Sequence, residues 1–159
     1  MLKLLILGLV FTFSFIQTGC QEEPPDIDKG EAGEELGIIE PELQPIEDTH
    51  QALNEAVCWD RIPDADDYEN IVNNNIPQLK KLKENVGIPE LERDLGRVIE
   101  IFQVELSGVY TVSANANKRE DVRELWVEAH RIMHDLDWGL LGNEPSDKTY
   151  YGYSEYLEK

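Results

Sequence analysis

The pattern of apolar and polar residues is clearest in the last third of the chain. Between residues 117 and 142 the apolar positions recur at intervals of four and three, which places them on one face of an α-helix. Asn117 and Glu120 have the spacing of a capping box that begins a helix. Gly139 and Gly142 are typical of its end. The predicted buried face carries Val122, Trp126, Ala129, Met133, Leu136 and Leu140.

Two helices are predicted upstream of residue 88 from shorter stretches of the same spacing. The first begins with a capping box at Asp48 and ends near Asp60. The second begins with a box at Asp66, and Gly87 is placed to end it. Pro77 lies inside this second pattern, and a proline in a helix interior must kink the helix or split it in two.

A further helix is predicted from Pro89, which suits the first turn of a helix, and its apolar spacing continues for about 25 residues. Residues 99–112 are rich in β-branched side chains, so a strand competes there, but the spacing favours a helix. Amphipathic helices with short connections pack as antiparallel bundles. We therefore predict an all-α fold, a small antiparallel bundle of about four helices over residues 48–159.

The segment before the predicted bundle has a different composition. Between Gln21 and Asp48 there are 11 acidic residues and one basic residue, Lys29, together with several prolines and glycines. Such a composition cannot bury enough apolar surface to offset the entropy lost on ordering the chain. Residues 20–47 are therefore predicted to form a disordered acidic tether.

The N-terminus has the pattern of a secretion signal. Lys3 precedes an apolar run over residues 4–16, which is shorter than the ~20 residues needed to span a bilayer. A small residue and a cysteine follow in Thr18, Gly19 and Cys20, and this order resembles the signal and lipobox of bacterial lipoproteins. An ordinary secretory signal with an incidental cysteine is the alternative interpretation.

The lipoprotein resemblance implies that residues 1–19 are a signal peptide and that the chain is cut before Cys20, whose thiol receives a diacylglycerol. Two or three acyl chains hold a protein to a membrane almost permanently. The protein would then be lipid-anchored in a bacterial cell membrane, facing outside the cytoplasm. Cys58 would be the remaining cysteine and, beside Val57 and Trp59, is expected to be a buried thiol.

The charge balance narrows the class of partner. The 159 residues include 33 Asp and Glu against 14 Lys and Arg, which gives a net charge of −19. Such a chain repels phosphates, so no nucleic-acid partner is expected, and a protein or cell-envelope partner is the remaining class. No phosphate loop, nucleophile elbow or HEXXH sequence is present, so we expect a binding protein more readily than an enzyme.

One group of residues has the spacing of a metal site. His130, His134 and Asp137 lie four and three residues apart, on one side of the predicted fourth helix and beside its apolar face. Two histidines four apart can chelate Zn²⁺, and the carboxylate can be a third ligand or orient a ring. His50 would join them if the first helix packs against the fourth. Packing at the bundle boundary explains the same histidines without a metal, and no cofactor is the default expectation.

The C-terminal tail is rich in tyrosine. Its tyrosines are Tyr150, Tyr151, Tyr153 and Tyr156. Exposed tyrosines at this density suit stacking on a sugar or a peptide. The alternative, which we favour, is that the tail folds back and closes the end of the bundle with Trp138.

Two functions are therefore expected from the sequence. The first is a membrane-anchored extracytoplasmic lipoprotein whose acidic helical bundle serves as an interaction or binding module. The second is a metal-binding lipoprotein that uses the His-x3-His pair of the fourth helix.

Overall fold

The computed structural model describes residues 40–57, 63–112, 120–142 and 151–157. These residues form helices and contain no strand. The elements in chain order are α2 (Glu40–Val57), α3 (Ala65–Asn70), η2 (Ile71–Asn75), α4 (Ile76–Val86), α5 (Pro89–Glu100), η3 (Ile101–Glu105), α6 (Ser107–Val112) and α7 (Glu120–Leu141). The two η elements are π-helical turns.

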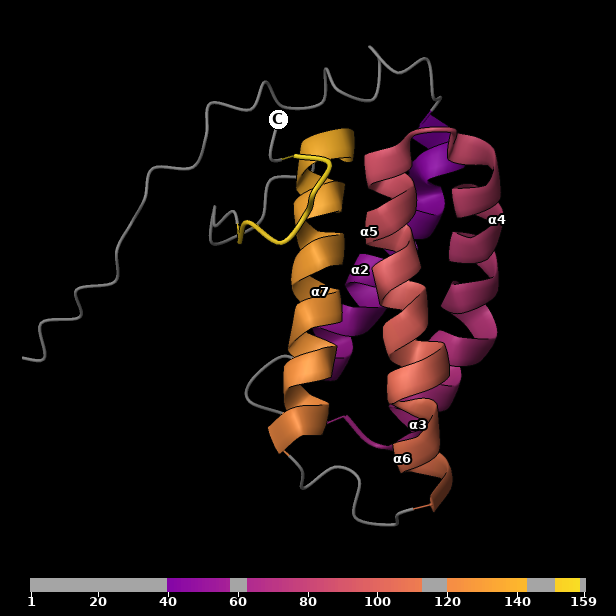
Figure 1. The fold of residues 1–159 in the computed structure, drawn as a ribbon, viewed down its shortest axis with the longest axis vertical. Helices are drawn as coiled ribbons and strands as arrows, with labels where there is room; N and C mark the ends of the chain where they lie inside the picture. Colours follow the sequence, from indigo (N-terminus) through magenta and orange to yellow (C-terminus); the bar gives the residue numbers. More distant parts are fainter. Residues whose placement is uncertain (1–39, 58–62, 113–119, 143–150, 158–159) are drawn as a thin grey trace, which may run out of the picture.

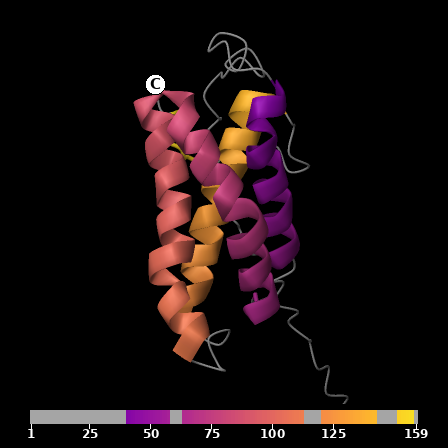
Figure 2. The ribbon, with the colours of Figure 1, turned by 90° about the vertical axis from the view of Figure 1, so that its right-hand side faces the viewer.

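The helices form four rods: α2 is the first and α7 the fourth, α3, η2 and α4 together form the second, and α5, η3 and α6 form the third. Successive rods run in opposite directions (Figure 1). Helix α2 packs against α7 and α4, and α5 packs against α4 and α7. The same side-by-side arrangement is visible after a quarter turn (Figure 2). The predicted all-α antiparallel bundle is therefore confirmed.

Helix α2 begins at Glu40, so the expected boundary between tether and bundle at residue 48 is wrong. Leu43 and Ile46 are fully buried in the core, although both were assigned to the tether. The composition of this segment was expected to bury too little apolar surface to fold, but Pro45 lies inside the helix, and its carbonyl accepts a hydrogen bond from the Thr49 hydroxyl. Asp48 lies inside α2, so it does not cap the start of this helix. The part of the proposed tether before residue 40 lies outside the described residues.

The second rod starts two residues earlier than predicted. The Asp64 carboxylate accepts hydrogen bonds from the backbone of Asp66 and Asp67, and the Asp67 carboxylate accepts one from the backbone of Asp64. The predicted interruption is present, because the π-helical turn η2 separates α3 from α4. Pro77 then stands in the first turn of α4, where its missing N–H costs no helical hydrogen bond.

The third and fourth rods follow the predicted spacing closely. The third begins at Pro89 and continues to Val112 without a strand, and a left-handed Gly87 makes the tight turn before it. Every residue of the predicted buried face of α7 is buried. Of the two glycines expected at the end of this helix, Gly142 follows its last residue, Leu141, in the left-handed conformation, whereas Gly139 lies inside α7.

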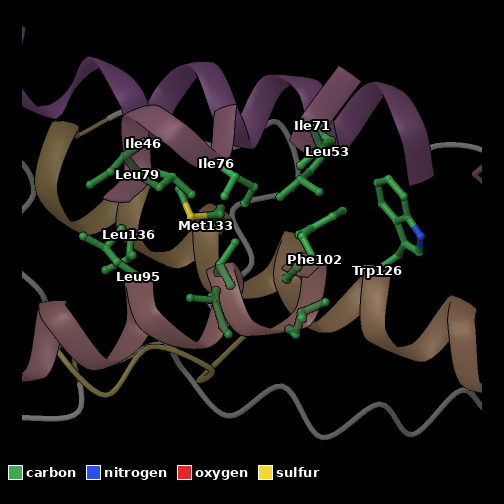
Figure 3. Packing of buried hydrophobic residues seen from close by; sticks show 14 of the residues in the cluster. Ile46, Leu53, Ile71, Ile76, Leu79, Leu95, Phe102, Trp126, Met133 and Leu136 are labelled. Carbon is green, nitrogen blue, oxygen red and sulfur yellow. The ribbon is translucent and has the colours of Figure 1, made fainter. Parts of the chain in front are cut away.

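The core runs along the axis of the bundle and receives side chains from all four rods. Trp126 and Phe102 fill one end of the region shown in Figure 3, and Ile46, Leu95 and Leu136 fill the other. Met133 lies between them and is fully buried. This packing fixes α2 against α7 and so decides which of their polar side chains meet.

Candidate functional site at the histidine cluster

The three histidines meet where α2 packs against α7. His50 comes from α2, and its ring centre lies 5.3 Å from that of His130 and 5.1 Å from that of His134. The centres of the His130 and His134 rings are 6.0 Å apart, as expected for residues one helical turn apart. The contact between the first and fourth rods, which the sequence left open, is therefore present. We call His50, His130, His134 and Asp137 the histidine cluster.

Asp137 connects the two helices of the cluster. Its Oδ2 lies 2.7 Å from Nδ1 of His50, and the two side chains are 8% and 18% exposed. An ionised carboxylate can only accept hydrogen bonds, so with Asp137 ionised the donor of this hydrogen bond is Nδ1–H of His50. His50 then has Nε2 as the ring nitrogen that can bind a ligand. Of the two roles predicted for Asp137, the structure shows ring orientation.

Asp135 is a buried carboxylate that the sequence analysis missed. It is fully buried, accepts the backbone N–H of Tyr151 at 2.9 Å and that of Tyr153 at 2.8 Å, and lies 3.7 Å from Nδ1 of His134. At 100° per residue Asp135 lies on the side of α7 away from the predicted core face, so helical spacing gave no signal that it is buried. Nothing in the sequence pointed to its partners in the tail.

The tail lies on the bundle beside the histidines. The ring of Tyr151 is centred 4.7 Å from that of His134. The Arg131 guanidinium lies over the rings of both Tyr151 and Tyr153, at 5.4 Å and 5.1 Å from their centres. We call residues 151–157 the strap, since they cross the outside of α7 (Figure 1).

A second buried carboxylate, Asp94 on α5, holds the far end of the strap. It accepts hydrogen bonds from the Ser154 hydroxyl at 2.8 Å and from the backbone N–H groups of Glu155 and Tyr156 at 3.0 Å and 3.1 Å. Burial raises the pKa of Asp94, and these hydrogen bonds offset part of that rise. Gly139 leaves room for the end of the strap, because a Cβ there would lie 2.5 Å from Leu157.

These contacts favour the folded-back tail over an exposed tyrosine platform. Tyr151 and Tyr156 are half-buried, and Trp138 is 6% exposed. Among these rings Tyr153 is exposed, at 41%. For Tyr151 and Tyr156 the folded-back alternative is therefore favoured, because the buried carboxylates bind the tail backbone and hold it against the bundle. Tyr150 lies outside the described residues, as do Cys20 and Cys58.

The side chains do not form a metal site as they stand. In the described ranges, no three His, Cys, Asp or Glu residues are arranged to hold one metal ion. The chemistry available at the cluster is that of imidazoles, which bind protons or transition metals, next to carboxylates that can orient them.

Comparison of the chain with protein family models, with curated proteins and with solved structures finds no match. Its function must therefore be argued from its own residues. Among the helices of the described ranges, none combines the length and the apolar content needed to cross a membrane.

Proposed function

We propose that this chain is a lipid-anchored protein of the bacterial cell envelope whose helical bundle is a binding module. The observation that supports the binding role is the histidine cluster, where titratable side chains from α2 and α7 meet in a half-buried position. The support for the anchor is the order of basic residue, apolar run, Thr18, Gly19 and Cys20 at the N-terminus.

The burial of charge around this cluster supports a binding role over a spacer role. Asp135 is fully buried, and His134 and Asp137 are buried as well. Taking ionised groups out of water costs several kcal/mol for each ion, whereas apolar side chains would close the same helix contact without that cost.

The acidic segment fits the same proposal. Residues 21–39 hold seven acidic residues and one basic residue; anionic headgroups repel such a run, and self-repulsion extends such a chain. Acyl chains on Cys20 would then hold the protein while residues before Glu40 keep the bundle away from the lipid surface.

The anchor is tested by replacing Cys20 with alanine. The Cys20→Ala chain cannot be acylated at this position, so membrane fractionation should show that the acylated membrane form is lost. Mass spectrometry of the wild type should show a chain that starts at an acylated Cys20. Cys58→Ala is the matched control, because it removes the other cysteine and should leave the anchor intact. A cleaved wild-type chain with an unmodified Cys20 would contradict the lipoprotein assignment.

A separate measurement tests the proposed binding role. Native mass spectrometry of the full chain, extracted in detergent, is expected to show a non-covalent ligand on the wild type that is lost in His50→Ala. A wild-type chain that carries no mass beyond its polypeptide and acyl groups would contradict binding at the cluster.

A further inference from the structure

We infer that the histidine cluster is a site for one Zn²⁺ ion, bound by the imidazoles of His50, His130 and His134, with Asp137 orienting His50. This inference rests on the proposed binding role of the cluster and names the chemical class of its ligand. It adds His50 from α2 to the pair on α7, so the ion would join the first and fourth rods of the bundle.

The spacing of the three ring centres fits a tetrahedral ion. A zinc–nitrogen bond is about 2.0–2.1 Å, and the centre of an imidazole lies about 1.2 Å beyond its nitrogen, so each ring centre is about 3.2 Å from the metal. Two ligands at a tetrahedral angle then have ring centres roughly 5 Å apart. The three observed separations are 5.1, 5.3 and 6.0 Å.

Ring rotation is what separates the present arrangement from a metal site. The ring nitrogens do not converge on one point as the side chains stand. The centre of an imidazole lies close to the line of its Cβ–Cγ bond, so rotation about that bond moves the nitrogens and leaves the centre nearly in place. This torsion is broad, with no high barrier between orientations. Ring torsion is therefore the first movement that metal binding requires.

The hydrogen bond between His50 and Asp137 supports the same site. Metal-binding histidines commonly donate their second ring N–H to a carboxylate, which fixes the tautomer and raises the basicity of the ligating nitrogen. The contact of 2.7 Å between Nδ1 of His50 and Oδ2 of Asp137 has this form, and Nε2 of His50 becomes the ligand atom. Asp137 is thus a positioning residue and not a ligand.

The charges around the cluster favour a cation. Asp135 and Asp137 are buried within three residues of His134, while Arg131 lies over the strap tyrosines. A divalent ion between the imidazoles would offset the cost of burying these carboxylates. The His50 side chain is 18% exposed, which leaves a route from solvent. The net charge of −19 also concentrates cations near the protein.

Titration of the full chain with Zn²⁺ tests the inference. The protein is extracted from membranes in detergent, stripped with a chelator and titrated in a calorimeter, and Co²⁺ is added in parallel because a tetrahedral cobalt site absorbs strongly in the visible. One ion per chain and a tetrahedral cobalt spectrum are expected. His50→Gln and His134→Gln should abolish both, and Asp137→Asn should weaken affinity by about 10–100-fold.

Gln51→Ala is the matched control, because Gln51 follows His50 on α2 but is exposed, and it should bind as the wild type does. Circular dichroism of each variant checks that the bundle is folded. If His134→Gln fails this check, His50→Gln still tests the site, because it replaces a part-exposed residue. Zinc binding that survives His50→Gln, as binding to surface carboxylates would, overturns the inference. Absence of zinc binding overturns the inference as well. The proposed binding role would remain if native mass spectrometry showed a ligand other than a metal ion on the wild-type chain.

Discussion

Two clusters of rings lie at different levels of α7, and they differ in what their polar atoms contact. Towards its start, Trp126 packs edge-on against Phe102, with ring centres 4.8 Å apart, and Tyr110 stacks on Tyr68 at 4.7 Å. Further along α7, the ring centres of the three imidazoles in the histidine cluster lie 5.1, 5.3 and 6.0 Å apart. Both clusters pack rings from separate rods, so ring packing alone does not distinguish a structural cluster from a chemical one.

The polar atoms make the distinction. In the aromatic cluster, Trp126 Nε1 donates to the Tyr110 hydroxyl, which donates to the carbonyl of Pro63, and the Tyr68 hydroxyl donates to the carbonyl of Phe102 in the turn η3. These partners are uncharged. In the histidine cluster the partners are carboxylates, which bind protons and orient metal ligands. The first cluster therefore stabilises the end of the bundle, and the second supplies the side chains of the zinc site that we propose.

The largest effect is expected from the aromatic cluster and the adjoining core. Trp126→Ala and Met133→Ala should each lower the free energy of unfolding by about 2–5 kcal/mol, because both residues are fully buried and their truncation leaves a cavity. Equilibrium denaturation measures the loss. Val104→Ala is the control, since Val104 is 66% exposed and should change stability by less than ~0.5 kcal/mol. Losses as small as the control at both core sites would contradict the packing described for α7.

An intermediate effect is expected where the strap meets α7. Asp135→Asn replaces one of the two acceptor oxygens with an amide N–H that faces a backbone donor, so stability should fall by about 1–3 kcal/mol. Limited proteolysis should then cut the tail faster. Glu124→Gln removes a charge from the exposed side of the same helix and serves as the control. An unchanged cutting rate in Asp135→Asn would show that the strap is held by other contacts.

The smallest effect is expected from Tyr110→Phe, which removes the acceptor of the Trp126 N–H and should cost about 1 kcal/mol. Burial raises the pKa of Tyr110 to about 12, above the unfolded value of 10.0. The unfolded chain therefore loses this proton first, and the contribution of Tyr110 to stability, present below pH 10, declines as the pH rises towards 12. Ultraviolet absorbance of tyrosinate follows the titration. A wild-type curve identical to that of Tyr110→Phe would contradict the burial of this hydroxyl.

The comparison of the two clusters also shows how far sequence reasoning reached. Trp126 and Met133 were assigned to the core from their spacing on one helix, because that spacing depends only on helical geometry. His130, His134 and Asp137 were grouped for the same reason. The start of α2 was misplaced because the acidic composition of residues 21–48 was taken as that of a tether, whereas Leu43 and Ile46 are buried by packing against other rods.

The sequence by itself determined the helical class, the order of the rods, the core face of α7 and the alignment of His130 with His134, because each depends on neighbours within a few turns of one helix. The tertiary structure alone decided that His50 joins them, that Asp135 and Asp94 bind the strap backbone, and that Gly139 admits Leu157. These contacts join residues up to 87 positions apart, as in the pair His50 and Asp137. Periodicity says which face a residue occupies, but only the packing of the rods says what lies opposite that face.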